Sequence, residues 1–202
     1  MIDLPDNELK KLEEEYESRF AWRKNRQLFN LKELAEIAQT GGADAMKKLP
    51  KLFSSITSND PRDALGWSIL MLWSEAAECY IYGEFQACIL ACGAVIERCL
   101  KLEYERTTGK MPGRRWTLGV CINKCRDIVA SDILELSQKI LEPRNNRAHA
   151  LLEHTDPQIS KIGGPNRGIE ELSNHHHLIE FYRGDASHVI RTTYQILEKL
   201  YT

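Results

Sequence analysis

The sequence predicts an all-α protein in which a bundle of four to five helices follows a helical N-terminal extension. Three observations predict this class. Apolar residues recur every three or four positions along most of the 202 residues, glycines and prolines stand at the ends of these periodic segments, and the strict apolar-polar alternation of strands is almost absent. A chain of this length is expected to bury one main core and to carry a smaller appendage.

The first periodic segment covers residues 7–39 and is ended by Gly41 and Gly42. Its spacing of three and four predicts one or two amphipathic helices, whose apolar side contains Leu9, Leu12, Tyr16, Phe20, Leu28, Leu31, Leu34 and Ile37. Residues 43–63 hold a short helical pattern followed by SSITSNDPRD, a composition typical of a linker. We therefore divide the chain near residue 60, into an N-terminal helical extension (1–60) and a main domain (61–202).

The main domain begins with two strongly apolar helical segments, residues 62–82 and 84–108, separated by Gly83. So short a connection predicts antiparallel neighbours in a bundle. After the loop KMPGRRW, we expect a third helix over residues 117–131 and a fourth over residues 132–154, which Pro143 must kink or divide. A long connection follows, with HHHL in or beside it, and residues 185–202 predict the closing helix.

Charge and cysteine content narrow the functional classes. The net charge of -2 and the isoelectric point near 6.3 give no global basic field, so any nucleic-acid surface has to be local. The polar, acidic N-terminus and the lack of long apolar runs predict a cytoplasmic protein without membrane contact. The six cysteines lie among apolar residues at helical spacing and are expected to be reduced core residues. The alternative is a four-thiolate metal site built from two C-x-x-x-C pairs. We favour the packed core cysteines and predict no metal or cofactor.

One polar cluster interrupts this apolar pattern, in ILEPRNNRAHALLEH at residues 140–154. Because proline is well tolerated in the first turn of a helix, Pro143 can begin a new segment with Arg144 and Asn145 in its first turn. Asn145 and His149 are four residues apart and share a helix face. The free amides of a helix start and the guanidinium of Arg144 would together suit a phosphate group.

Arginine and histidine beside a phosphate can in principle cleave RNA without a metal. Imidazole transfers protons near neutral pH, and guanidinium matches the phosphate oxygens with two parallel hydrogen bonds. The 2′-hydroxyl must lose a proton and the leaving 5′-oxygen must gain one, so two imidazoles serve better than one. A symmetric homodimer would supply the second.

The segment RNNRAH resembles the R-N-x-x-x-H motif of the HEPN superfamily. ACILACGAVIERCLKLEYE upstream and ASHVIRTTYQILEKLY at the C-terminus are similar to helices that flank the motif in bacterial members, so the resemblance covers roughly residues 64–202. It implies a bundle of four or five helices, a homodimer, and metal-independent endoribonuclease activity in antiviral defence, toxin-antitoxin or RNA-processing systems. By position, Arg144 and His149 would be catalytic, and Asn145 would orient them.

The resemblance also implies an antitoxin or another regulatory protein as a partner. In one toxin-antitoxin branch, a tyrosine two residues after the histidine is modified by that partner. Leu151 stands at that position here, so the resemblance does not extend to this mode of control.

Other residues offer RNA-binding and alternative interpretations. Residues 98–126 hold eight lysines and arginines against two glutamates, a local net charge of 8 minus 2, or +6. Basic residues next to an aromatic ring suit single-stranded RNA, so we assign RNA binding to Arg114, Arg115, Trp116 and Arg147. A solvated loop explains the same charges.

His175, His176 and His177 diverge on any regular backbone and are expected to belong to a loop. The main alternative is a non-catalytic helical interaction or RNA-binding module, in which the motif only caps a helix.

Overall fold

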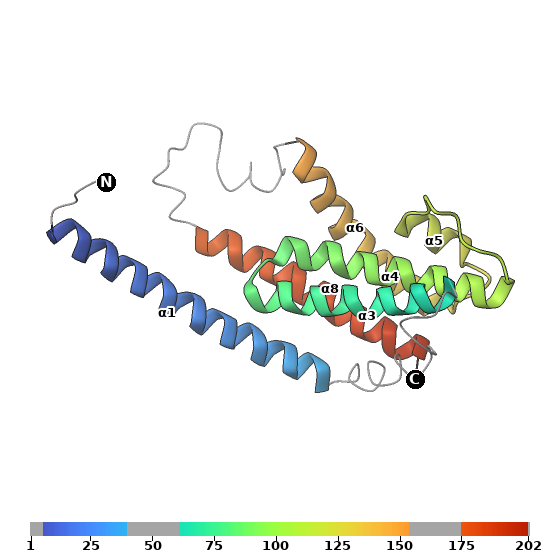
Figure 1. The fold of residues 1–202 in the computed structure, drawn as a ribbon. Coiled ribbons are helices and arrows are strands. Elements are labelled where there is room, and N and C mark those ends of the chain that lie inside the picture. Colours follow the sequence, from blue (N-terminus) through green and yellow to red (C-terminus); the bar gives the residue numbers. More distant parts are fainter. Residues whose placement is uncertain (1–5, 40–60, 154–174, 202) are drawn as a thin grey trace.

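The computed structural model describes residues 6–39, 61–153 and 175–201 (Figure 1). The all-α prediction is confirmed for these residues, because no strand occurs among them. The helices are α1 (Asp6–Ile37), α3 (Pro61–Tyr82), α4 (Phe85–Thr108), α5 (Leu118–Lys124), α6 (Ser131–Glu153) and α8 (His175–Tyr201). The expected boundary near residue 60, and the helical pattern before it, lie outside the described residues.

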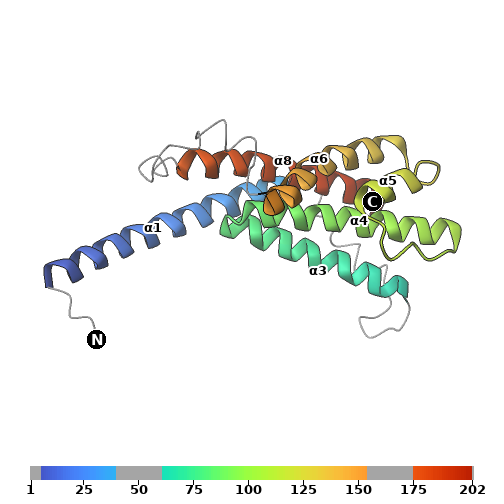
Figure 2. The ribbon, with the colours of Figure 1, turned by 90° about the horizontal axis from the view of Figure 1, so that it is seen from above.

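The α3–α4 pair forms the antiparallel hairpin that the single-glycine connection predicts (Figures 1 and 2). Gly83 takes a φ of 81°, in the left-handed region that favours glycine. Its amide donates to the Tyr80 carbonyl at 3.1 Å, and the Glu84 amide donates to the Cys79 carbonyl at 2.8 Å. These bonds satisfy carbonyls that the end of α3 leaves open, so the chain reverses within two residues.

Helix α4 is the central element of the bundle, because it packs against α3, α5, α6 and α8. Its apolar residues are buried on more than one side, including Ile89, Val95, Ile96 and Leu100, none of which is exposed to solvent. A helix that is apolar over most of its circumference is stable only in such a central position. Every element of the candidate site is therefore positioned relative to α4.

Helix α1 is continuous and packs on α3 through its C-terminal part, while its N-terminal part extends beyond the bundle in both views (Figures 1 and 2). Its buried stripe contains Asn30, Leu34 and Ile37, with Glu33 beside them. Leu28 and Leu31, which we expected on the apolar side, are 49 % and 48 % exposed. The face of α1 that is buried therefore differs from the predicted apolar face and includes polar residues. Apolar spacing alone does not predict this difference.

Two predicted helix boundaries were wrong. The third helix ends at Lys124, because residues 125–129 tighten into turns in which the Ile128 and Val129 amides both donate to the Cys125 carbonyl at 3.0 Å. Helix α8 begins at His175, ten residues before the expected start at residue 185, so HHHL belongs to its first turns. Of the two outcomes expected at Pro143, a kink or a division, division does not occur, because Pro143 lies inside α6. Lys139, whose carbonyl loses its amide partner to this proline, is exposed, so water can reach that turn.

None of the helices in the described part of the chain is both long enough and apolar enough to cross a membrane.

Candidate functional site

The candidate site is built on α6 around Arg144 and Asn145. The Arg144 Nη1 atom donates a hydrogen bond to the Asn145 Oδ1 atom at 3.1 Å, and both side chains are half-buried. This contact removes part of the rotational freedom of a long side chain. The hydrogen bond to Asn145 therefore limits the orientations of the guanidinium.

A glycine on the neighbouring helix makes room for the Arg144 side chain. Gly93 of α4 is buried, and a Cβ atom added there would lie 2.7 Å from Cγ and 3.4 Å from Cβ of Arg144. Real Cβ atoms almost never come that close to another carbon, so the stem of Arg144 rests on bare α4 backbone. The position of the guanidinium is therefore set by two helices, with α6 carrying it and α4 supporting it.

The polar face of α4 continues from Gly93 to Glu97 and Lys101, one and two turns further along. The Lys101 Nζ atom donates to the Glu97 Oε1 atom at 2.6 Å, and the two side chains are only 7 % and 19 % exposed. Because the two charges of this pair cancel, they add little net field beside α6. None of the carboxylates whose side chains the structure describes is paired with Arg144, so its positive charge can serve another anion.

The predicted anion site at a helix start was wrong. Since Pro143 lies within α6, Arg144 and Asn145 lie in a helix interior, where most backbone amides are used by the i to i−4 hydrogen bonds. No helix N-terminus assists phosphate binding at this point. The side chains themselves must supply the donors.

His149 belongs to the same helix, but its side chain and that of Arg147 lie outside the described residues. The backbone of α6 is helical through both positions. Four residues of α-helix advance about 6 Å and turn by about 40° beyond a full turn. His149 and Asn145 therefore share one face of α6, as their spacing predicts.

The predicted RNA-binding residues near the end of α4 lie away from Arg144. Arg114 and Arg115 are exposed, while Trp116 is half-buried with its ring centroid 4.8 Å from that of Tyr104 and the Lys124 Nζ atom 6.0 Å above it. Gly109 follows Gly93 by sixteen positions, which is about 24 Å of helix. The structure therefore does not bring the basic loop and the motif together within one chain.

The basic segment is also less charged at its surface than its composition indicates. Lys101 is buried in its pair with Glu97, and Arg106 is paired with Glu103 at 3.3 Å. Arg106 stays exposed in its pair, and the exposed cations outside such ion pairs are Lys110, Arg114, Arg115, Lys124 and Arg126. They lie in the loop after α4 and around α5.

The cysteines are free thiols packed in the core, as expected. Five of them are buried, and burial raises the pKa of Cys99 and of Cys121 to about 12 and that of Cys125 to about 11. No group of three or more metal-ligating side chains occurs within residues 6–39, 61–153 and 175–201. The described cysteines therefore form no four-thiolate site, and the side chains of His175, His176 and His177 lie outside the described residues.

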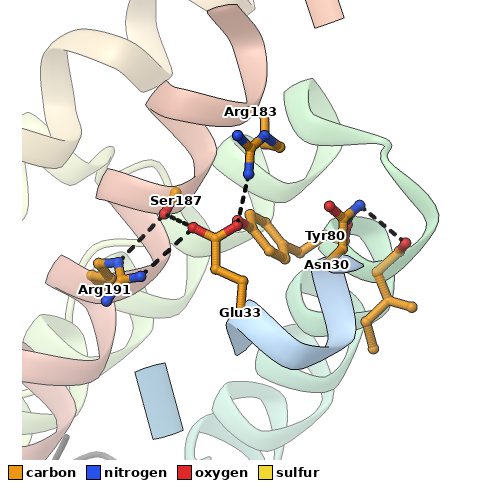
Figure 3. A network of polar contacts seen from close by, with 7 residues as sticks. Asn30, Glu33, Tyr80, Arg183, Ser187 and Arg191 are labelled. Carbon is orange, nitrogen blue, oxygen red and sulfur yellow. Dashed lines mark hydrogen bonds and ion pairs between the residues drawn. The ribbon is translucent and has the colours of Figure 1, made fainter. Parts of the chain in front are cut away.

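Sequence reasoning missed a polar network that joins α1 to the bundle (Figure 3). Glu33 of α1 accepts hydrogen bonds from the Tyr80 hydroxyl at 2.6 Å, the Ser187 hydroxyl at 2.7 Å and Arg183 Nη1 at 3.1 Å. Arg191 Nη2 lies 3.6 Å from the same carboxylate. One side chain of α1 therefore connects α3 and α8.

Asn30, one turn earlier, adds a second connection. Its Nδ2 atom donates to the Tyr80 carbonyl at 3.0 Å and to the Ile81 carbonyl at 3.3 Å, in the last turn of α3. The Tyr80 carbonyl also accepts from the Gly83 amide, so the asparagine adds a second donor to it and supplies a donor to the Ile81 carbonyl at the end of α3.

The network shifts the acidity of its members. Burial by itself would raise the pKa of Glu33, but the hydrogen bonds from Tyr80 and Ser187 and the charges of Arg183 and Arg191 outweigh it, so this pKa lies below its ordinary value. Burial and the hydrogen bond to Glu33 raise the pKa of Tyr80. The carboxylate is therefore held in its ionised form. In the sequence, the only signal of this network is that Asn30 and Glu33 interrupt the apolar stripe that continues with Leu34 and Ile37.

No family model matches the chain, and neither a curated protein nor a solved structure matches it.

Proposed function

We propose that this protein is a metal-independent endoribonuclease whose site is formed by Arg144, Asn145 and His149. The observation that carries the proposal is the placement of Arg144. Its stem is seated on Gly93, its guanidinium is held by Asn145, and the α6 backbone places His149 one turn further on the same helix. An arginine oriented in this way suits an anion that binds through two oxygens.

The reaction follows from these groups. One imidazole removes the proton of the 2′-hydroxyl, and the 2′-oxygen forms a bond to phosphorus. The bond from phosphorus to the 5′-oxygen breaks, and this oxygen takes a proton from an imidazolium. Arg144 neutralises the non-bridging oxygens, which gain charge in the transition state. The products are a 2′,3′-cyclic phosphate and a 5′-hydroxyl.

The resemblance to HEPN proteins supports the same assignment through the motif RNNRAH and the helices on either side of it. The all-α fold is consistent with it. On this basis we propose a homodimer in a defence or toxin-antitoxin context, with RNA as substrate, a regulatory protein as partner and the cytoplasm as location.

Purified protein incubated with labelled RNA in excess EDTA tests the activity. We expect cleavage to continue in EDTA, to leave cyclic phosphate ends and to be lost in His149→Ala. Arg144→Lys is expected to lose nearly as much activity as Arg144→Ala, because an ammonium cannot reproduce a planar two-point contact. Cleavage that stops on chelation and returns with a divalent ion would contradict this mechanism.

A second candidate function is RNA binding without cleavage. The observation that favours it is the exposed basic loop, which lies about 24 Å of helix away from Arg144. In that case RNA binding falls when Arg114 and Arg115 are both replaced by alanine, while His149→Ala changes neither binding nor the integrity of the RNA. The two candidates are separated by whether the wild-type protein produces new RNA ends.

A further inference from the structure

A cavity of about 610 Å³ lies where α1 meets the turn between α3 and α4. This volume is in the usual range for small-ligand sites. Its walls come from two parts of the chain that are far apart in sequence. Helix α1 and the turn contribute Trp22, Arg23, Arg26, Gln27, Tyr82, Gly83 and Glu84.

Arg26 forms a fixed cationic wall of this cavity. Its guanidinium carbon lies 5.2 Å from the ring centroid of Trp22 and 5.0 Å from that of Phe85, so the cation is held against two aromatic rings. Gly83 allows this placement, because a Cβ atom there would lie 3.2 Å from the Arg26 Cζ atom. The charge is therefore set in place by the fold rather than carried on a freely moving side chain.

The remaining lining combines exposed aromatic surface with hydrogen-bonding groups. Trp22 is 40 % exposed and Tyr82 is 65 % exposed. Arg23 is exposed as well and gives the cavity a second guanidinium against the single carboxylate of Glu84. Gln27 offers both a donor and acceptors at the edge of a ligand. A ligand that matches these aromatic rings and guanidinium groups is planar and apolar in one part and anionic in another.

We propose that this cavity binds a nucleotide, either free or as one unit of an RNA strand. The base stacks on the exposed aromatic surface of Tyr82 and Trp22, and the phosphate pairs with Arg23 and Arg26. Stacking on aromatic side chains and pairing with arginine are the two interactions by which proteins hold single nucleotides without reading their sequence. Glu84 accepts a hydrogen bond from a ribose hydroxyl or a base amine.

The position of the cavity has two consequences. Because its walls belong to α1 and to the α3–α4 turn, a bound nucleotide stabilises the docking of α1 on the bundle. The cavity also lies toward the start of α4, where Glu84 is nine residues before Gly93, or about 14 Å of helix. A strand with one nucleotide in the cavity can therefore extend toward Arg144. The binding itself does not require that the protein cleaves RNA.

Isothermal titration of the full chain tests the proposal with four probes: adenosine monophosphate, adenosine, inorganic phosphate, and a short 2′-O-methyl oligoadenylate that lacks the attacking hydroxyl. We expect adenosine monophosphate or the oligoadenylate to bind at least tenfold more tightly than adenosine or phosphate. Tighter binding of the monophosphate identifies a free nucleotide as the ligand, and tighter binding of the oligoadenylate identifies a strand.

Two variants locate the binding. Tyr82→Ala and Arg23→Ala remove exposed side chains from the cavity and are each expected to weaken binding about tenfold or more, the loss that corresponds to about 1.4 kcal/mol. Met71→Ala, at an equally exposed residue of α3 outside the cavity lining, is the control for the first. Lys24→Ala, which removes a neighbouring exposed charge of α1 outside the lining, is the control for the second.

A second readout is independent of the affinity. Amide hydrogen exchange of residues 22–30 should slow when the preferred nucleotide is bound, because the ligand joins α1 to the turn. The proposal is overturned if neither nucleotide probe binds, if phosphate alone binds equally well, or if Tyr82→Ala and Arg23→Ala bind as the controls do.

Discussion

Gly93 and Arg144, on neighbouring helices, share a space that one methyl group would fill. Replacing Gly93 with alanine puts a Cβ atom 2.7 Å from Arg144 Cγ, an atom too near the backbone to move away without displacing the whole side chain. The variant gains about 0.5–1 kcal/mol from the better helix propensity of alanine, and crowding of this kind costs about 1–3 kcal/mol. The net loss of stability should therefore be no more than about 2.5 kcal/mol, so the variant is expected to fold with a displaced guanidinium.

We predict that Gly93→Ala lowers RNA cleavage on the order of a hundredfold, since a shift of about 1 Å at a catalytic group has effects of that size. Gly119→Ala in α5 is the matched control, because its Cβ atom would meet Leu141 at 3.6 Å, an ordinary contact. Cleavage rates and thermal unfolding of both variants are the measurements. Full activity of Gly93→Ala would show that Arg144 does not depend on this support.

The thiols give a second prediction at this scale. Cys88, Cys92, Cys99, Cys121 and Cys125 are fully buried, whereas Cys79 is only partly buried. Burial raises the pKa of Cys79 as well, so even this thiol reacts slowly. We expect a thiol reagent at pH 7 to modify at most one cysteine in the native protein and all six in denaturant. Rapid modification of several cysteines would contradict the packed core.

The spacing in the sequence was sufficient to place Asn145 and His149 on one face of a helix, because helical periodicity needs no knowledge of the tertiary structure. An orienting role for Asn145 came only from the resemblance. The sequence could not predict that Gly93 supports Arg144. That contact depends on the relative height and rotation of α4 and α6, which apolar periodicity leaves undetermined. The same limit applies to Arg26 and Gly83, whose contact joins two distant segments.

At the scale of helices, Glu33 is the residue that connects α1 to the rest of the molecule. Hydrogen bonds to a charged group contribute about 1.5–3 kcal/mol each, and removing one partner leaves the others unsatisfied. We predict that Glu33→Ala lowers the free energy of unfolding by at least about 2 kcal/mol and increases proteolysis within α1. Glu36→Ala, at an exposed residue of the same helix, should have almost no effect. Urea denaturation of the two variants tests this.

The same network predicts a dependence on pH. Because folding lowers the pKa of Glu33 from its ordinary value of 4.5, the carboxylate contributes its full stabilisation above pH 4.5. This contribution is lost as the pH falls through the lower pKa of the folded state. The difference in unfolding free energy between the wild type and Glu33→Gln should therefore shrink below pH 4.5. A difference that stays constant from pH 7 to acid would show that the charge of Glu33 is not what holds α1.

Helix boundaries were predicted correctly where local sequence signals are strong and incorrectly where tertiary contacts determine the end of a helix. The α3–α4 hairpin was predicted almost to the residue, since apolar periodicity and Gly83 define both ends. The end of α5 was predicted incorrectly, and the division of α6 that we allowed at Pro143 does not occur. Proline disfavours a helix interior by about 3 kcal/mol, and only packing against α4, α5 and α8 can offset that cost.

At the scale of the whole molecule, the proposed cleavage needs two proton-transfer groups, and the motif of one chain provides a single one. Cleavage needs a base beside the 2′-oxygen and an acid beside the 5′-oxygen, about one phosphate apart. The motif supplies a single His149 per chain. A two-fold axis beside the α6 helices would bring a second imidazole and a second guanidinium to the same phosphate. We therefore predict a homodimer with one shared site.

Tandem-linked dimers test the shared site directly. A linked dimer with His149→Ala in one half keeps one imidazole, and its rate should fall far below half of the wild-type rate, because the composite site loses one of its two proton-transfer groups. Independent sites would instead leave one complete site and half of the rate. Linked dimers that carry Lys24→Ala in one half control for the effect of the linker and of a surface substitution. A half-rate result for the His149→Ala dimer, or cleavage by a strict monomer, would exclude the shared site, since in either case one chain would be providing both proton transfers by itself.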